Sequence, residues 1–148
     1  MKSLKTKPNT GKRFFAGLID YTIIYGFTFM LIFGLGTRDE YGTYSLNGFP
    51  ALIPIALWLV LTVILEITLG ATLGNSLVGI MPIPSTGHQR KLTFIESLKR
   101  HLLDPLDMFP LGIIGIITIN NTLNNQRVGD IWAKTIVVSE KHFIENPI

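Results

Sequence analysis

The chain has 148 residues, of which 47% are hydrophobic and 16% are charged, and its mean hydropathy is +0.40. A soluble domain carries about 25% charged residues, so the composition excludes disorder and disfavours a water-soluble globule. The absence of cysteine excludes disulfides, thiolate metal sites and a cysteine nucleophile. The net charge is +3, but the basic residues lie between long apolar runs, which is typical of a membrane protein rather than a nucleic-acid binder.

Two apolar runs are long enough to cross a bilayer, which needs about 20 helical residues. Residues 14–36 contain Asp20 as their only charged residue, and residues 51–73 contain Glu66 as theirs. The first run is too long for the apolar part of a signal peptide and lacks a cleavage motif, so we expect it to remain in the mature protein. The sequence thus predicts an all-α polytopic membrane protein with one domain over residues 1–148.

A third apolar region covers residues 102–123 and is interrupted by Pro105 and Pro110. Because proline lacks a backbone N–H and crowds the preceding turn, one continuous helix is disfavoured. Two alternatives remain: a single span, or a re-entrant hairpin broken near Pro110, with arms of about 18 Å that would not cross a core of about 30 Å. We favour the hairpin. The pattern of residues 93–103 predicts an amphipathic helix at the membrane surface.

The distribution of lysine and arginine predicts the orientation. Five lie before the first run, one between the two runs, four in the segment after the second run and three in the C-terminal part. The positive-inside rule therefore predicts a cytoplasmic N-terminus in a multi-pass protein. A re-entrant third region would also keep the C-terminal basic residues inside, whereas a third span would place them outside.

The chain contains a weak internal repeat. Arg13 precedes Asp20 by seven residues, and Arg100 precedes Asp107 by the same spacing. Each half then contains an apolar–glycine pair followed by a short segment of β-forming residues, at 73–83 and 128–138. Two such segments would pair at the cytoplasmic surface, because an unpaired edge would otherwise remain. We therefore expect parallel repeats with a small cytoplasmic β element.

Three groups of motifs resemble the RDD family of small bacterial membrane proteins. They are GKRFFAGLIDYTI, then GATLGNSLVGI with SLKRHLLDPLD, and finally NNQRVGDIWAKTIVV, and together they extend from about residue 11 to residue 138. The family is named for one conserved arginine and two conserved aspartates. By motif position, Arg13 and Asp20 match the first arginine and aspartate, and Asp107 and Asp130 match the later acidic positions.

The resemblance implies a bacterial inner-membrane location. Some members of the family have been proposed to exchange sodium or other monovalent cations for protons. The chain departs from the family pattern at Asn75, where a lysine is usual, and at Pro82 and Pro84, which interrupt the expected β segment.

Charged residues inside the membrane need an explanation, because each costs about 2.5–3.5 kcal/mol at mid-bilayer on insertion scales. One interpretation is that Asp20, Glu66 and Asp107 form a proton or small-cation site. The other is a structural network in which arginines neutralise these carboxylates. For Asp130, a role as a helix N-cap is an alternative to any functional role. The candidate network comprises Arg13, Asp20, Glu66, Arg100, Asp104, Asp107, Arg127 and Asp130. If the repeat is real, the two Arg–Asp segments lie side by side and Arg13 serves Asp104.

Two functional hypotheses follow. In the first, the protein is a monovalent cation/proton transporter or a subunit of one. In the second, it is a non-transporting membrane scaffold that binds a partner protein or assists assembly. The candidate protein partners are a membrane protein or further copies of this chain. His88, His101 and His142 lack the spacing of a metal site, and we expect each to be solvated or interfacial. No pattern indicates an enzyme, a cofactor, a metal or a nucleic acid, so we expect the lipid bilayer to be the main partner.

Overall fold

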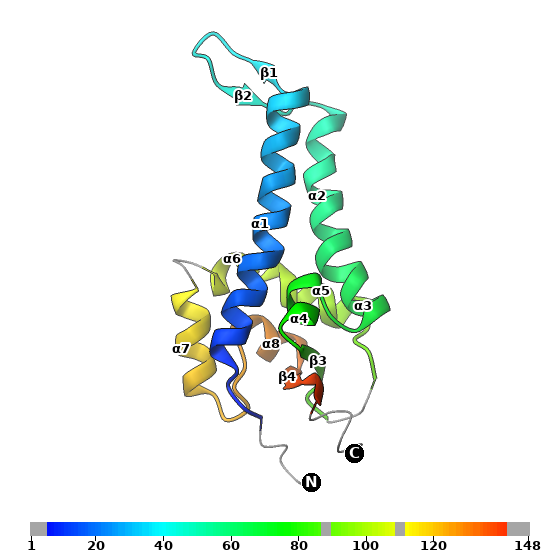
Figure 1. Cartoon of the computed structure of the whole chain (residues 1–148), viewed down its shortest axis with the longest axis vertical. Coiled ribbons are helices and arrows are strands. Elements are labelled where there is room, and N and C mark those ends of the chain that lie inside the picture. Colours follow the sequence, from blue (N-terminus) through cyan, green and yellow to red (C-terminus); the bar gives the residue numbers. More distant parts are fainter. Residues whose placement is uncertain (1–5, 87–89, 109–111, 142–148) are drawn as a thin grey trace.

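A computed structural model describes residues 6–86, 90–108 and 112–141, and they are mostly helical (Figure 1). Two long helices stand side by side and extend beyond a layer of short helices and a small sheet. In chain order the elements are α1 (Thr10–Leu35), β1 (Thr37–Arg38), β2 (Tyr44–Ser45), η1 (Phe49–Leu52), α2 (Ile53–Trp58), η2 (Leu59–Ile64), α3 (Leu65–Leu69), α4 (Leu73–Leu77), β3 (Ile80–Pro84), α5 (Phe94–Leu102), α6 (Asp104–Asp107), α7 (Ile113–Asn121), α8 (Val128–Ala133) and β4 (Thr135–Ser139).

Two helices match the predicted spans in length and composition. They are α1 and the continuous helix Phe49–Leu69, in which η2 is a π-helical stretch. The second ends four residues before the predicted boundary at residue 73. Gly70 has a φ of 95° and donates its N–H to the carbonyl of Glu66, so the chain leaves the helix there in the left-handed conformation that suits glycine.

A short antiparallel hairpin, β1–β2, joins the two long helices. Asp39 shapes its turn, because its Oδ1 accepts the backbone N–H groups of Tyr41 at 2.9 Å and Thr43 at 2.8 Å. The hairpin lies at the far end of the molecule from the N-terminus (Figure 1). The two long helices therefore form an out-and-back unit that begins and ends beside the layer of short helices.

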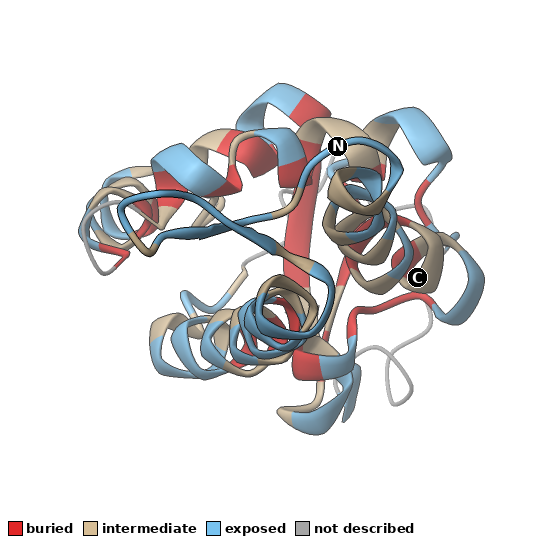
Figure 2. Ribbon diagram, turned by 90° about the horizontal axis from the view of Figure 1, so that it is seen from above, coloured by how far each residue is buried: buried red, intermediate tan, exposed pale blue. Residues whose placement is uncertain are grey.

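The predicted amphipathic helix is confirmed as α5, but its polar side faces the interior of the protein. Thr93 begins the helix, because its hydroxyl accepts the N–H of Glu96 while the Glu96 carboxylate accepts the N–H of Thr93. Ser97, Arg100 and His101 are buried, whereas the apolar side chains of Phe94, Ile95 and Leu102 are exposed. Figure 2 shows this arrangement: buried residues gather between the helices, and the outward faces are largely exposed.

Residues 102–123 do not form one long helix where the structure describes them. They contain α6 and α7, and α7 has only nine residues, a length of about 14 Å. Pro105 occupies the first turn of α6, where its missing N–H costs nothing, and Pro110 lies outside the described residues. The segment after α7 returns to the N-terminal end of α1, because the Thr6 hydroxyl donates to the carbonyl of Asn124 at 2.7 Å.

The predicted β element is confirmed as the antiparallel pair β3–β4. Its register joins Ile80 to Ser139 and Pro84 to Thr135, so β3 runs through both Pro82 and Pro84. Prolines are accommodated because each strand of a two-stranded sheet has a free edge. Ala16, Ile80 and Val137 form a small apolar core between α1 and this sheet.

The close approach of α4 to α1 depends on Gly74. A Cβ built at Gly74 would lie 2.1 Å from the carbonyl oxygen of Ala16, whereas one built at Gly26 on α1 would meet no atom within 4 Å. We predict that Gly74→Ala lowers the stability of the detergent-solubilised protein by about 1–3 kcal/mol, because the backbones must separate. Gly26→Ala is the matched control and should leave stability equal or slightly higher. Equal melting temperatures for the two variants would contradict this packing.

Candidate functional site

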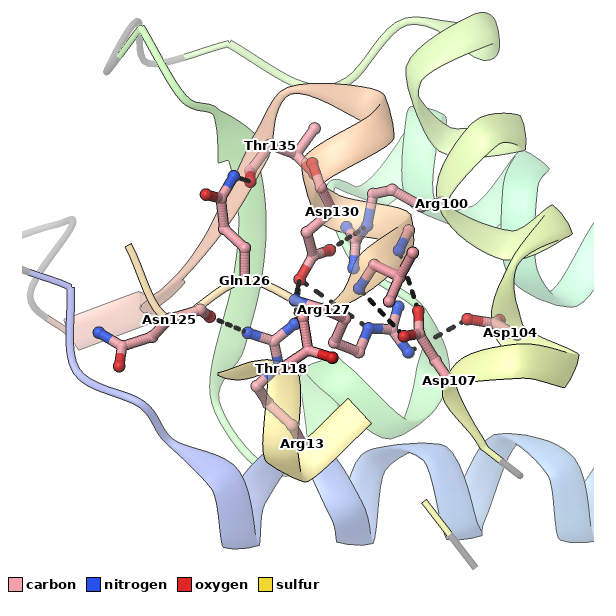
Figure 3. Close-up of polar contacts among 12 residues, drawn as sticks. Arg13, Arg100, Asp104, Asp107, Thr118, Asn125, Gln126, Arg127, Asp130 and Thr135 are labelled. Carbon is pink, nitrogen blue, oxygen red and sulfur yellow. Dashed lines mark hydrogen bonds and ion pairs between the residues drawn. The ribbon is translucent and has the colours of Figure 1, made fainter. Parts of the chain in front are cut away.

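Charged side chains from α1, α3, α5, α6 and α8 meet in the interior of the protein, and Figure 3 shows those from α1, α5, α6 and α8. Most of them are almost completely buried: Asp130 and Glu66 are 0% exposed, Asp107 is 1% and Arg100 and Asp104 are 2%. We call this set the charge network. Its members are Arg13, Asp20, Glu66, Arg100, His101, Asp104, Asp107, Arg127 and Asp130.

Asp130 is the centre of the network. Its Oδ2 accepts from Arg13 and from the backbone N–H of Arg127 at 3.0 Å, and its Oδ1 lies 3.0 Å from Nε of Arg100. Arg13 comes from α1 and Arg100 from α5, so one carboxylate joins the two halves of the chain (Figure 3). The contact to the Arg127 N–H also stabilises the start of α8, but Asp130 does this as the third residue of the helix, and the N-cap position that the sequence suggested for it is occupied by Arg127. A buried carboxylate needs such compensation, because losing its water is costly.

Glu66 is held by three side chains of α5. Arg100 Nη1 lies 2.9 Å from its Oε1, the Ser97 hydroxyl donates to its Oε2 at 2.7 Å, and His101 Nε2 is 3.4 Å from its Oε1. Residues three and four apart share a helix face, so these three residues of α5 all point toward the second long helix. Glu66 therefore attaches α5 to that helix.

His101 lies between Glu66 and Asp104. Its Nδ1 is 2.7 Å from Asp104 Oδ2, which also accepts from the Tyr21 hydroxyl at 2.9 Å, and Arg127 Nη1 lies 3.1 Å from Asp104 Oδ1. Burial lowers the pKa of His101, but Asp104 and Glu66 outweigh this and raise the pKa to about 9. Burial raises the pKa of Asp104, but His101 and Arg127 outweigh this and lower it to about 2.

These pKa shifts mean that the imidazolium–carboxylate pair is formed at neutral pH. Because the folded pKa of His101 lies above its ordinary value of 6.5, its contribution to stability is complete below pH 6.5. The contribution is lost as pH rises through about 9.

Asp20 and Asp107 are held by hydrogen bonds of another kind, at the beginnings of short helices. Asp20 accepts from the Thr72 hydroxyl at 2.6 Å and from the Gly74 N–H at 2.7 Å, where α4 begins. Asp107 accepts from the N–H groups of Val128 and Gly129, both at 3.0 Å, where α8 begins. Among the described residues, no Lys, Arg or His nitrogen lies within 4.0 Å of either carboxylate.

The two halves repeat this arrangement. Gly74 lies against the carbonyl of Ala16 on α1, and Gly129 lies against the carbonyl of Arg100 on α5. Each short helix is followed by one strand of the sheet. With Gly74 equivalent to Gly129, Asn75 takes the position of Asp130. The network is therefore asymmetric, because the carboxylate that gathers the arginines exists in one half only.

A small cavity of about 30 Å³ lies beside the network. Its lining includes Asp20, Thr72, Asn75, His101 and Asp104. A space of this size has room for about one water molecule or one small ion.

All eight residues predicted from the sequence lie in the charge network, but two expectations about it were wrong. Arg13 pairs with Asp130 instead of Asp104, because Arg127 occupies Asp104. His101, expected to be solvated or interfacial, is 5% exposed. Its spacing of three residues from Asp104 and four from Ser97 could have indicated the shared polar face. His88 and His142 lie outside the described residues.

The comparisons with known proteins give one match. The pattern of the RDD family matches residues 7–134. No curated protein and no solved structure is matched. Within the described ranges, no group of three or more His, Cys, Asp or Glu residues is arranged to hold a metal ion.

The network predicts a large effect for a change at its centre. We expect Asp130→Asn to destabilise the protein by about 3–5 kcal/mol, because it removes the buried negative charge that Arg13 and Arg100 face. The control is Arg90→Gln, which breaks the exposed pair with Glu96 and should cost at most about 1 kcal/mol. The measurement is the melting temperature in detergent. A melting temperature of Asp130→Asn equal to that of the wild type would show that Asp130 does not hold the network together.

Proposed function

The chain belongs to the RDD family, and we propose from this membership and the charge network that it is a membrane protein exchanging a proton for a small monovalent cation at Asp20. The observation that carries the proposal is the bonding of Asp20. Its two hydrogen-bond donors, Thr72 and Gly74, are neutral, although the carboxylate is buried. A proton or a cation would supply the missing positive charge.

The charges of the network support this proposal. Its five carboxylates, Asp20, Glu66, Asp104, Asp107 and Asp130, are accompanied by three arginines and one histidine. The network therefore has one more negative than positive charge, even when His101 is protonated. The N-terminal dipoles of α4 and α8 offset part of this excess. A buried charge that is only partly compensated favours uptake of a proton or a cation.

Asp20 suits exchange better than Asp107. The cavity beside Asp20 is also lined by Thr72 and Asn75, whose side chains contain oxygen atoms, and hard cations prefer oxygen ligands. A lysine at position 75, as is usual in the family, would place a fixed positive charge in this cavity. Asn75 adds no further charge to a lining that contains Asp20 and Asp104 together with Arg13, Arg100, Arg127 and His101.

We predict that Asp20→Asn abolishes sodium-driven pH changes in proteoliposomes while leaving the melting temperature nearly unchanged. The asparagine oxygen can accept from the Gly74 N–H and its amide can donate to the Thr72 hydroxyl oxygen, but the amide binds no proton. The measurement uses a pH-sensitive dye in sodium-loaded vesicles. Asp39→Asn is the matched control, since Asp39 also accepts two hydrogen bonds, here from the backbone N–H groups of Tyr41 and Thr43, but is exposed. Vesicles of the wild-type protein that show no exchange would refute the transport proposal.

The second candidate is a non-transporting scaffold for a partner protein or another copy of the chain. It is favoured by the three carboxylates that are ion-paired, Glu66, Asp104 and Asp130, which behave as structural links. In this case the wild type shows no exchange, and Asp20→Asn changes neither the flux nor the melting temperature. The flux measured for the wild-type protein therefore separates the two functions.

We also propose a topology in the bacterial inner membrane. The N-terminal arm, the β3–β4 sheet and the C-terminal segment share the cytoplasmic side, and residues 102–123 enter the membrane and return. Support comes from Thr6, which bonds to Asn124 and accepts from the side chain of Asn125.

A reporter fused after Ile148 should therefore be cytoplasmic, and one inserted at Gly42 in the β1–β2 hairpin should be external. The expected pair of signals is high fluorescence for a C-terminal fluorescent protein and high activity for phosphatase at Gly42. An external location of the C-terminal reporter would contradict the re-entrant segment and would show a third span.

A further inference from the structure

The outer surface of α5, α6 and α8 is apolar, although the same helices bury a highly polar interior. Six large side chains form it, each between 43% and 57% exposed: Phe94, Ile95, Leu102, Leu106, Ile131 and Trp132. We call this the α5–α8 surface. A surface helix of a soluble protein turns its polar side chains to water and its apolar side chains to the core. Here the arrangement is reversed, and the polar residues that face inward are Ser97, Arg100, His101, Asp104 and Asp107.

We propose that phospholipid covers the α5–α8 surface, with acyl chains against its apolar residues and an anionic headgroup at Lys99 and Trp132. The proposal rests on the membrane placement given under the proposed function. An exposed apolar patch of this extent needs a partner, and the molecule already presents lipid-facing helices beside it.

Continuity with α1 identifies lipid as this partner. α6 lies beside α1, where Phe14 and Leu18 border an apolar groove together with Pro105 and Met108. Phe14 and Leu18 are 40% and 49% exposed on a helix suited to cross the membrane. The groove therefore links the apolar exterior of α1 to α6, whose Leu106 belongs to the α5–α8 surface.

Contacts between α1 and α6 place the α5–α8 surface in one leaflet. Tyr21 bonds to Asp104, and Gly17 lies against Met108, so α6 is level with residues 17–21 of α1. These residues lie about 5–11 Å along the helix axis from Phe14, where the apolar run begins, which is within the half-thickness of about 15 Å of the hydrocarbon core. The helices thus lie in the leaflet at the N-terminal end of α1.

Lys99 and Trp132 mark the level of the headgroups. Lys99 Nζ is 5.6 Å from the centre of the Trp132 ring. Tryptophan concentrates where the hydrocarbon meets the headgroups, and lysine beside it extends its ammonium toward phosphate. An ammonium above an aromatic ring at this level is complementary to the phosphate of an anionic lipid.

The test uses the chain's two tryptophans, Trp58 on α2 and Trp132 on α8. In proteoliposomes of the Trp58→Phe variant, the emission of Trp132 is measured with lipids brominated near the headgroup end or near the methyl end of the acyl chain. We expect stronger quenching by bromine near the headgroup and little quenching by aqueous iodide. The Trp132→Phe variant, which reports from Trp58, is the control and should be quenched by acyl-chain bromine at greater depth.

Anionic lipid provides the second arm of the test. Brominated phosphatidylglycerol should quench Trp132 more strongly than brominated phosphatidylcholine, and Lys99→Gln should remove this difference. Quenching by iodide would show a surface in water, and protection from both bromine and iodide would show a protein partner or a second copy; either result overturns the proposal. Equal quenching by both lipids overturns the headgroup assignment. Because no ion flux is measured, failure here is distinguishable from failure of cation exchange.

Discussion

The fold depends on one buried carboxylate that the two halves of the chain share. Asp130 receives Arg13 from α1 and Arg100 from α5, while its own helix begins at Arg127. Apolar packing alone is limited, since the core between α1 and the sheet is small. The short helices are consequently held by charge and hydrogen bonding inside the protein, and the apolar residues are free to face outward. The fold uses polar contacts where a soluble protein uses its hydrophobic core.

Asp20 and Asp107 show how a repeat can place different chemistry at equivalent positions. Each holds the start of a short helix, and each helix approaches a neighbour through glycine. The halves differ at Asn75 and Asp130, so the second half supplies the shared carboxylate. A proton or cation bound near Asp20 would therefore lie beside the network without breaking its central ion pairs.

Local sequence patterns predicted the elements better than the contacts between them. The apolar run of residues 14–36, the amphipathic pattern of residues 93–103 and the β-forming segments each carry a local signal. The partners of the arginines do not, because Arg13 could reach several acids and only the tertiary arrangement selects Asp130. Burial of His101 was missed for the same reason: a single histidine on an amphipathic helix looks interfacial until the direction of its polar face is known.

The prolines of β3 affect how copies of the protein can meet. The backbone nitrogens of Pro82 and Pro84 face the edge of β3 that lies away from β4. Neither nitrogen carries a hydrogen, so neither can donate to a further strand. A two-stranded sheet with open edges invites strand addition by other chains, which leads to aggregation. The prolines remove donors from one of those edges. Crowding of many copies in a membrane should therefore bring them together through their helices, without joining their sheets into a continuous β-structure.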